Sequence, residues 1–337
     1  MRIQVMGWYG RRNSGDEAFK LVLRALLPEH SINWSHGNLP NNYASGDVIV
    51  LGAGDVLRPY YLEHLPSDAR FFVYGAGLDG DEDVSYAASL KDRIIGAWFR
   101  NRSDVDTLRK RGLDVNYTPD IVFQLGDQLR RQAFAPEQGT KKVTVCPSAN
   151  LDQHALLTND AALSMYSNFF KLQLASIIDI LLKRGYEVVL VPMSFDYNDY
   201  DLGYCCQLYS AIKGDRSRVR IIEAEPSMSA IAGVIGSSEF TITTKFHGMI
   251  YSVMMGRPFI SIGMGMKNER FCVENGLSSL HVPRFSLHAS SFLNALDAAL
   301  SSDASQRIQS VAQRLEAEAS QAGQSFRHFL VTHSGQQ

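Results

Sequence analysis

A lysine and a histidine, two residues apart, follow a short strand pattern in the second half of the chain. The β-branched and aromatic run Phe240–Thr243 predicts a strand, and the apolar run from Gly248 to Gly256 predicts a helix. Lys245 and His247 therefore lie at a strand-to-helix turn. Free backbone N–H groups and the helix dipole favour a phosphate or carboxylate at such a turn, and they disfavour a protonated histidine. This placement indicates acid/base chemistry on an anionic substrate.

Further cations follow the next strand pattern. Residues 259–262 are apolar and precede Lys267-Asn268-Glu269-Arg270, which adds two positive side chains. A plainer explanation remains open for this region, in which Lys245 is solvated and His247 caps a structural turn.

A glycine-rich segment follows the first strand pattern of the chain, residues 2–6. It begins at Gly7 and leads to Asp16 and Glu17 in the first turn of a predicted helix, whose start Asn13 or Ser14 can cap. The segment lacks the Gly-Lys-Ser/Thr ending of a P-loop, and its glycines do not fit the dinucleotide spacing. A standard nucleotide-phosphate loop is therefore not predicted. The two carboxylates have a structural explanation as dipole partners, which also stays open.

Seven short motifs stand in order along the chain: residues 7–18 (GWYGRRNSGDEA), 51–57 (LGAGDVL), 74–78 (YGAGL), 99–103 (FRNRS), 118–123 (TPDIVF), 245–250 (KFHGMI) and 266–277 (MKNERFCVENGL). They are spread over most of its length, and with them the chain resembles the polysaccharide pyruvyl transferase family.

The chain departs from the family pattern at three places. Lys245-Phe246-His247 stands where the family has Arg-Leu-His, Gly52-Ala53-Gly54 replaces a glycine triplet, and Arg100-Asn101 replaces an Arg-Asp pair. A lysine keeps the positive charge but loses the bidentate fork of arginine. These departures indicate a divergent branch, which can keep the fold while changing its substrate.

The resemblance implies a fold and a reaction. The expected fold is α/β, with two Rossmann-like domains that face each other across a cleft as in GT-B enzymes. The expected reaction moves the enolpyruvyl group of phosphoenolpyruvate onto a sugar of a cell-surface polysaccharide or its precursor, which forms a pyruvate ketal. The carrier of the saccharide acceptor, lipid or nucleotide, is left open. No organic cofactor and no metal are expected.

The resemblance and the turn chemistry together assign roles to particular residues. His247 is expected as general acid/base, and Asp16 is expected to contact or deprotonate the acceptor. Lys245, Lys267 and Arg270 are expected to hold the negative groups of the donor. The remaining candidates for substrate binding are Tyr9, Asn13, Glu17, Gly52 and Gly54.

Length and composition bound the organisation. A chain of 337 residues suits two domains, and 45% hydrophobic with 20% charged residues is typical of a globular protein. Alternating strand and helix patterns predict an N-terminal domain over residues 1–135 and a C-terminal domain over 136–303. The resemblance implies that the first is on the acceptor side and the second on the donor side. Residues 128–141 are the expected boundary. Residues 304–337 are expected to form an amphipathic helix, which packs on a domain or crosses back to the first, and a disordered tail.

Charge and hydropathy exclude several classes. A formal net charge of −2 gives no electrostatic footprint for nucleic acid. No apolar run approaches the length of a transmembrane helix and no signal peptide is evident, so a cytoplasmic location is expected. The four cysteines show no Cys-x-x-Cys spacing and are expected to be free thiols. The sequence leaves the oligomeric state open.

Two alternative functions remain at this stage. A GT-B glycosyltransferase that uses a nucleotide sugar would share the fold and the phosphate turn. A non-catalytic glycan-binding protein would use aromatic side chains as stacking platforms, for which the candidates are Trp8, Tyr9, Tyr60, Tyr61, Phe195 and Tyr197. The presence of both Lys245 and His247 argues against the second alternative.

Overall fold

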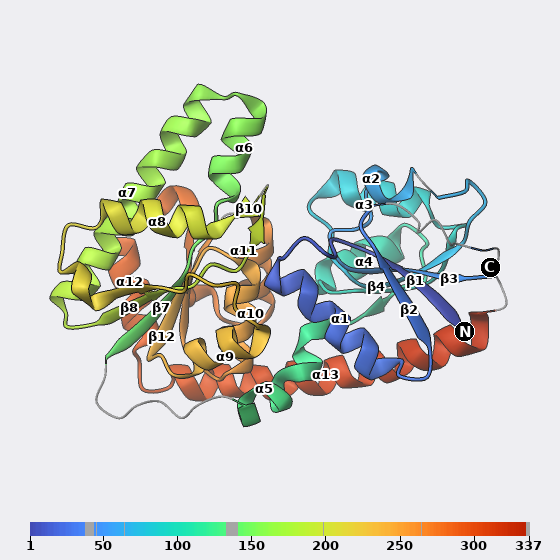
Figure 1. The fold of residues 1–337 in the computed structure, drawn as a ribbon. Coiled ribbons are helices and arrows are strands. Elements are labelled where there is room, and N and C mark those ends of the chain that lie inside the picture. Colours follow the sequence, from blue (N-terminus) through green and yellow to red (C-terminus); the bar gives the residue numbers. More distant parts are fainter. Residues whose placement is uncertain are drawn as a thin grey trace. The chain divides into compact units, whose positions relative to one another are not determined.

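The computed structural model describes every residue except 38–43, 45, 64, 133–140, 198, 264 and 335–337. The chain divides into two compact units (Figure 1). Unit 1 comprises Met1–Arg11, Gly15–Leu125 and Gln313–Gln337, and unit 2 comprises Arg12–Ser14 and Gly126–Ala312. The main segment of unit 2 therefore begins at Gly126. The sequence placed the boundary within residues 128–141, of which 133–140 lie outside the described part.

Unit 1 is a parallel six-stranded sheet with the strand order β2-β1-β3-β4-β5-β6. The chain starts at β1, adds β2 on one side, and then crosses to β3 and its followers on the other side. The strands are β1 (Arg2–Met6), β2 (Ser31–Ser35), β3 (Val48–Gly54), β4 (Phe71–Ala76), β5 (Ile94–Phe99) and β6 (Asn116–Tyr117). The connecting elements are α1 (Ser14–Leu26), α2 (Pro59–Leu62), α3 (Asp81–Ser89), α4 (Arg102–Lys110) and the 3-10 turn η1 (Ile121–Leu125).

Unit 2 is a second parallel six-stranded sheet, with the order β11-β8-β7-β12-β13-β14. In chain order this is the 3-2-1-4-5-6 arrangement of a Rossmann fold. Its strands are β7 (Lys142–Cys146), β8 (Glu187–Leu190), β11 (Val219–Ile221), β12 (Phe240–Thr243), β13 (Phe259–Gly263) and β14 (His281–Pro283). A separate two-stranded ribbon is formed by β9 (Phe195–Asp196) and β10 (Asp199–Tyr200).

Eight α-helices within the described part of unit 2 flank its sheet: α5 (Gly126–Gln132), α6 (Asn150–Thr158), α7 (Ala161–Lys183), α8 (Asp201–Ala211), α9 (Met228–Gly236), α10 (Phe246–Met254), α11 (Met266–Glu274) and α12 (Ala289–Ala299). Three 3-10 turns complete it, η2 (Arg216–Arg218), η3 (Ser278–Leu280) and η4 (Arg284–Ser286).

The C-terminal helix α13 (Ala304–His333) contributes to both units, because the division falls after Ala312. All seven apolar positions that indicated an amphipathic helix are buried: Ile308, Val311, Ala312, Leu315, Ala319, Ala322 and Phe326. The Phe326 ring stacks on Tyr74 with a centroid distance of 4.1 Å and meets Trp98 edge-on at 5.3 Å. The part of α13 after Ala312 therefore packs on the sheet of unit 1.

A three-residue segment near the N-terminus belongs to unit 2 although β1 and most of α1 belong to unit 1. Asn13 pairs with Ser194 as an antiparallel bridge. The Ser14 amide donates to the carbonyl of Met193 at 2.9 Å, and the Phe195 amide donates to the carbonyl of Arg12 at 3.0 Å. The backbone of residues 12–14 thus extends the β9 region of unit 2.

The predicted fold class is confirmed, with two parallel α/β sheets of the GT-B-like kind. The sequence predicts strands at residues 2–6, 47–51, 71–74, 94–99, 142–146, 187–192, 219–222, 240–243 and 259–262. They correspond to β1, β3, β4, β5, β7, β8, β11, β12 and β13. Three edge-proximal strands, β2, β6 and β14, were not predicted, since β2 reads Ser-Ile-Asn-Trp-Ser with polar ends and the other two are only two and three residues long. In the described part of the chain, no helix is long and apolar enough to cross a membrane.

Candidate functional site

The turn that carries Lys245 and His247 has the predicted strand-to-helix form. Strand β12 ends at Thr243, Lys245 is the N-cap residue in an extended conformation, and α10 begins at Phe246. The Thr244 amide donates to the carbonyl of Cys146 at the end of the neighbouring strand β7. From β7 the sheet grows first towards β8 and β11 and then, on the other side, towards β12, so β7 and β12 form the topological switch point of this parallel sheet. Ligands of open α/β sheets bind at the carboxyl ends of such a pair.

Lys245 is buried and forms an ion pair with Asp201, with 3.1 Å between Nζ and Oδ2. The Asp201 carboxylate is inaccessible to solvent and also accepts backbone hydrogen bonds from Ala149 at 2.9 Å, Met193 at 3.2 Å and Ser194 at 2.9 Å. Several N–H donors stabilise the charge of a buried carboxylate. The pair therefore fixes the lysine ammonium at the start of α10.

Sequence reasoning did not single out Asp201. It lies in the polar segment of residues 194–204, which reads equally well as a mobile lid or an exposed connector. The only local signal is an aspartate at the first position of a helix, which usually means a dipole partner. Its actual partners come from the β7 and β8 ends and from β12, and only the fold brings these together.

His247 lies in the first turn of α10 beside two aromatic rings. Its ring centroid is 5.5 Å from that of Phe246 and 6.3 Å from that of Tyr251. The Tyr251 hydroxyl donates to the carbonyl of Ser14 at 3.1 Å. The Asn13–Ser14 backbone is thereby attached to the helix that carries His247, which places the predicted residues Asn13, Lys245 and His247 in one region of unit 2.

Lys267 and Arg270 lie in the first turns of α11, which follows β13, and both side chains are half-buried. Because β12 and β13 are adjacent and parallel, the N-termini of α10 and α11 lie at the same edge of the sheet. The Phe246 and Phe271 rings meet edge-on at 6.2 Å between the two helices. The two helix dipoles and the cations Lys267 and Arg270 lie at this edge, where Glu269 adds a negative charge and Lys245 is paired with Asp201.

Two thiols border the Lys245–Asp201 pair. Burial raises the pKa of the Cys146 and Cys205 thiols, and the Asp201 carboxylate raises both further. Both sulfurs are therefore protonated at neutral pH, and neither is suited to act as a nucleophile or a metal ligand. In the residues that the structure describes, no group of three or more His, Cys, Asp or Glu side chains is arranged to hold a metal ion.

The candidates of unit 1 gather at the carboxyl ends of β1 and β3, where its strand order reverses. The Tyr9 hydroxyl donates to the carbonyl of Gly52 at 2.8 Å. A Cβ atom on Gly52 would lie 2.8 Å from that hydroxyl and 2.8 Å from Val5, so the close packing of Tyr9 requires glycine there. Burial raises the pKa of Tyr9, and the charges of Asp16 and Glu17 raise it further. Tyr9 is therefore a neutral hydrogen-bond donor.

Asp16 faces the β3 loop. A Cβ atom on Gly54 would lie 3.4 Å from Asp16 Oδ1, and Gly54 has a φ of +82°, which favours glycine. Burial raises the pKa of Tyr61, and the Asp16 charge raises it further. Glu17 instead binds its own loop, where it accepts the Gly10 amide at 2.7 Å. The structure thus brings Tyr9, Asp16, Glu17, Gly52 and Gly54 together.

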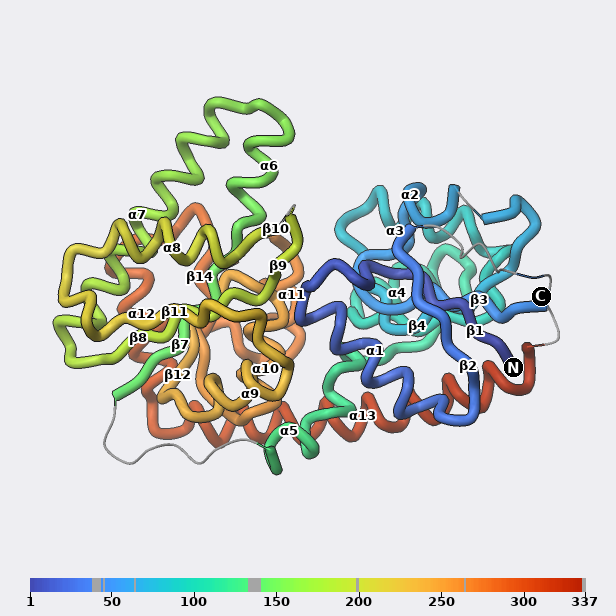
Figure 2. The backbone as a smooth tube through the Cα atoms, viewed as in Figure 1, coloured from blue at the N-terminus to red at the C-terminus, as the bar shows by residue number. Residues whose placement is uncertain are grey.

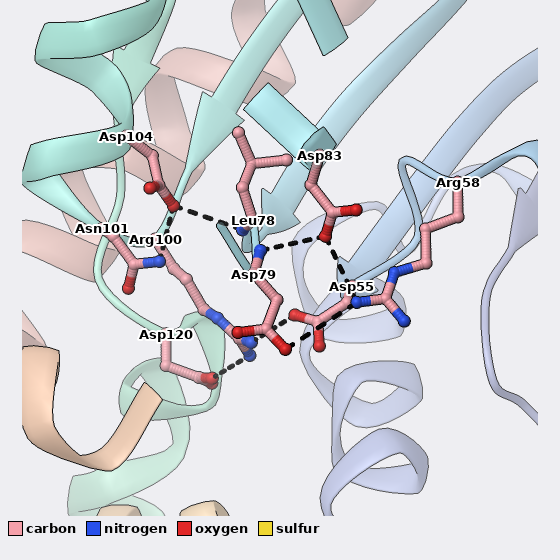
Figure 3. A network of polar contacts seen from close by, with 9 residues as sticks. All are labelled: Asp55, Arg58, Leu78, Asp79, Asp83, Arg100, Asn101, Asp104 and Asp120. Carbon is pink, nitrogen blue, oxygen red and sulfur yellow. Dashed lines mark hydrogen bonds and ion pairs between the residues drawn. The ribbon is translucent and has the colours of Figure 1, made fainter. Parts of the chain in front are cut away.

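A buried arginine joins the other glycine motifs of unit 1 (Figure 3). Arg100 lies 2.8 Å from Asp55 and 3.6 Å from Asp120, and its side chain is only 4% exposed. A Cβ atom on Gly77 would collide with this guanidinium. Asn101 donates to Asp104 at 2.6 Å, and the same carboxylate accepts the Leu78 amide. Four of the motifs that carry the family resemblance are therefore parts of one polar network.

Aromatic side chains border this region. Trp8 meets His36 edge-on at 4.3 Å, and the Tyr60 hydroxyl lies 3.0 Å from His36 Nε2. Tyr60 and Tyr61 are in edge-to-face contact at 5.0 Å. Of these two rings, Tyr60 is exposed and Tyr61 is buried, so the Tyr60 ring is the one that a ligand could stack on.

A polysaccharide pyruvyl transferase family model matches residues 13–265, three quarters of the chain. The chain belongs to the polysaccharide pyruvyl transferase family. The match runs from β2 to β13, so it leaves out one strand of each sheet, β1 and β14. It includes Asp16, Lys245 and His247, while Tyr9 precedes it and Lys267 and Arg270 follow it. No curated protein matches the sequence significantly.

Solved structures of the same fold cover nearly the whole chain of this family member. Anabaena HepE, crystallised with UDP and glucose, has a TM-score of 0.51 at 11% identity, with 98% of this chain and 99% of that chain covered. UDP-GlcNAc 2-epimerase from Neisseria meningitidis, bound to UDP-GlcNAc, has a TM-score of 0.58 at 8% identity, covering 97% and 99%. The MnaA–UDP structure from S. aureus has a TM-score of 0.58 at 9% identity, with 93% of this chain and 94% of that chain covered. At these identities the likeness concerns the fold alone.

Proposed function

We propose that the protein is a pyruvyl transferase that uses phosphoenolpyruvate as donor and a saccharide as acceptor. In the overall reaction the donor methylene gains a proton and becomes a methyl group. Two acceptor hydroxyls form C–O bonds to the former enol carbon and lose their protons, and the C–O bond to phosphate breaks. The products are a cyclic pyruvate ketal and inorganic phosphate.

The observation that carries the proposal is the Lys245–His247 turn at the N-terminus of α10 in unit 2, in a chain of this family. The donor bears a phosphate and a carboxylate, and the start of α10 offers backbone N–H groups, a dipole and a lysine for such groups. Lys267 and Arg270 at the start of α11 add charge at the same edge of the sheet. Fixed cations of the chain would then stabilise the leaving phosphate.

His247 is proposed as the general acid that protonates the donor methylene, since imidazole is the side chain whose ordinary pKa suits acid/base catalysis near neutral pH. Asp16 is proposed to contact or deprotonate an acceptor hydroxyl. Asn13, Tyr9, Glu17 and the glycines at 52 and 54 are proposed to shape substrate binding, with unit 1 serving the acceptor and unit 2 the donor. The acceptor would be a sugar of a cell-surface polysaccharide or its precursor.

Asp201 is proposed as a positioning residue that acts through Lys245. A lysine has a flexible stem and lacks the fork of the arginine that the family has at this place. The buried ion pair with Asp201 limits that flexibility, because the carboxylate is itself held by three backbone amides. The pair thus offers a physical reason why this chain can use lysine here.

The test combines ligand binding with turnover. Thermal melting is measured with phosphoenolpyruvate, inorganic phosphate and UDP, for the wild type, His247→Ala, Lys245→Ala and the matched exposed control Lys213→Ala. We expect phosphoenolpyruvate to raise the melting temperature of the wild type and of Lys213→Ala, and not of Lys245→Ala. Phosphate release in the presence of a saccharide panel should be lost in His247→Ala.

The competing donor is a nucleotide sugar, because three solved structures of this fold hold UDP or UDP-GlcNAc. Stabilisation of the wild type by UDP, with no effect of phosphoenolpyruvate, would refute the proposed donor and favour glycosyl transfer.

A further inference from the structure

A helical hairpin of unit 2 presents large apolar side chains to solvent. It consists of α6 and the first half of α7, which stand out from the sheet of this unit (Figure 2). Its exposed patch, defined here as the hairpin patch, comprises five side chains that are between 56% and 75% exposed: Leu156, Leu157, Met165, Phe169 and Leu172. Single exposed apolar side chains are ordinary, but five large ones on one hairpin are not.

The α7 part of the patch follows the spacing of a coiled-coil seam. Ala162, Met165, Phe169, Leu172 and Ser176 are all exposed and are separated by three, four, three and four residues. This alternation keeps side chains on one line along a helix and is the pattern by which two helices pack knobs into holes. The opposite side of α7 is already occupied, because Phe170, Leu174 and Ile178 are buried. The exposed seam is thus additional to the core of unit 2.

The hairpin offers almost no charge with which a lipid surface would interact. Its charged residues between 150 and 176 are Asp152, Asp160 and Lys171. Lys171 lies 2.9 Å from Asp152 and is buried, and Asp160 caps α7 by accepting the Leu163 amide. Helices that bind membrane surfaces carry Lys and Arg on their polar face. The hairpin lacks them, so its charge pattern does not fit an anionic membrane.

The extent of the exposed apolar surface suits a specific interface. Phe285 in η4 is 77% exposed, and its ring lies 5.1 Å from that of Tyr166 on α7, next to the seam. At about 150–250 Å2 per aromatic side chain, Phe169 and Phe285 alone expose roughly 200–330 Å2, and the four aliphatic side chains of the hairpin patch add to this. The exposed surface therefore reaches the size of the largest patch of a typical monomer, about 300–600 Å2, which is often functional, and extends towards the ~800 Å2 that each partner buries in a standard interface.

From these observations we infer that the hairpin patch is the interface of a homodimer, in which the α7 seams of two copies pack against each other. An uncharged seam is self-complementary, and a twofold axis lets the same patch serve both copies. Small residues at both ends, Ala162 and Ser176, flank three large ones. With a twofold axis at Phe169, an antiparallel pairing sets Met165 opposite Leu172 and Ala162 opposite Ser176, so large side chains meet large ones and small ones meet small ones.

The experiment is light scattering after size exclusion, with the full-length chain at micromolar concentration. We expect the wild type to have the mass of a dimer and Phe169→Glu to have half that mass. Val331→Glu is the matched control, because Val331 is 50% exposed on α13, outside the patch, and this variant should stay dimeric. Far-ultraviolet circular dichroism spectra should be similar for all three, since neither residue belongs to the core.

A second variant keeps the test informative if Phe169→Glu folds poorly. In a Cys206→Ser background, which removes the exposed native thiol, Phe169→Cys should form a covalent dimer with a short bismaleimide. A monomeric wild type, or a dimer that survives both Phe169→Glu and Leu172→Glu, would overturn the inference. So would a monomer that floats with phosphatidylcholine or phosphatidylglycerol vesicles and loses this property in Phe169→Glu.

Discussion

Replacement of Asp201 by asparagine probes the ion pair that holds Lys245. The change is nearly isosteric and keeps one oxygen to accept backbone amides, but it removes the charge that faces the lysine at 3.1 Å. Breaking one partner of a buried pair costs about 3–5 kcal/mol, because the other charge is left uncompensated. For a unit of this size, 1 kcal/mol shifts Tm by about 2–4 °C, so we expect a fall of roughly 10 °C.

The double variant Asp201→Asn/Lys245→Met separates stability from function. It removes both charges, so the melting temperature should recover most of the loss, and the coupling between the two sites should be positive in a double-mutant cycle. Stabilisation by phosphoenolpyruvate should not recover, since the cation for the donor is absent. The assays are thermal melting and chemical denaturation, with and without phosphoenolpyruvate, of the wild type, Asp201→Asn, Lys245→Met and the double variant.

Two results would refute this reasoning. If Asp201→Asn changes the free energy of unfolding by less than about 1 kcal/mol, the pair is not the buried and uncompensated contact described above. If Asp201→Asn keeps full stabilisation by phosphoenolpyruvate while Lys245→Ala loses it, Asp201 does not position the lysine.

Three other regions give further expected outcomes. Gly77→Ala should destabilise unit 1 by about 1–3 kcal/mol because its Cβ atom collides with Arg100, whereas Gly233→Ala, with open space inside α9, should stabilise by ~0.5–1 kcal/mol; urea unfolding measures both. Burial lowers the pKa of His281, so the unfolded chain binds this proton first, and stability should fall as pH drops below about 6.5; His281→Gln should flatten that part of a melting-temperature profile. Phe326→Ala should cost about 3–5 kcal/mol in denaturation, since the ring is fully buried; a loss below 1 kcal/mol would contradict its packing.

Most of the sheet architecture could be predicted because its strands are buried on both faces and read as continuous apolar runs. Strands β3 (Val-Ile-Val-Leu-Gly-Ala-Gly) and β4 (Phe-Phe-Val-Tyr-Gly-Ala) are of this kind. Strand β2 escaped because its residues are only partly buried at the edge of the sheet, where side chains need not be apolar. The strand-to-helix turn at Lys245 was predictable for the same reason, since both flanking elements have strong local patterns.

The partners of the site residues could not be predicted, because they are distant in sequence. Asp201 reaches Lys245 from another helix, and Arg100 meets Asp55 and Asp120 from three separate loops. A sequence pattern reports which face of an element is buried and does not report which polar group lies opposite it. The motifs around the glycines thus suggested a ligand, whereas part of their role is to make room for Tyr9 and Arg100.

The insertion of residues 12–14 into unit 2 has a consequence for the order in which the chain can fold during synthesis. Their hydrogen-bond partners Met193, Phe195 and Tyr251 are made much later. At about 5–20 residues per second, the ribosome needs on the order of 10–50 s to reach Tyr251 after this segment emerges. Strand β1 and helix α1 can pair locally in that interval, but the short link between them must stay hydrated until the second sheet exists. This link therefore docks late in folding. Once it docks, hydrogen bonds to unit 2 hold the end of the glycine-rich segment.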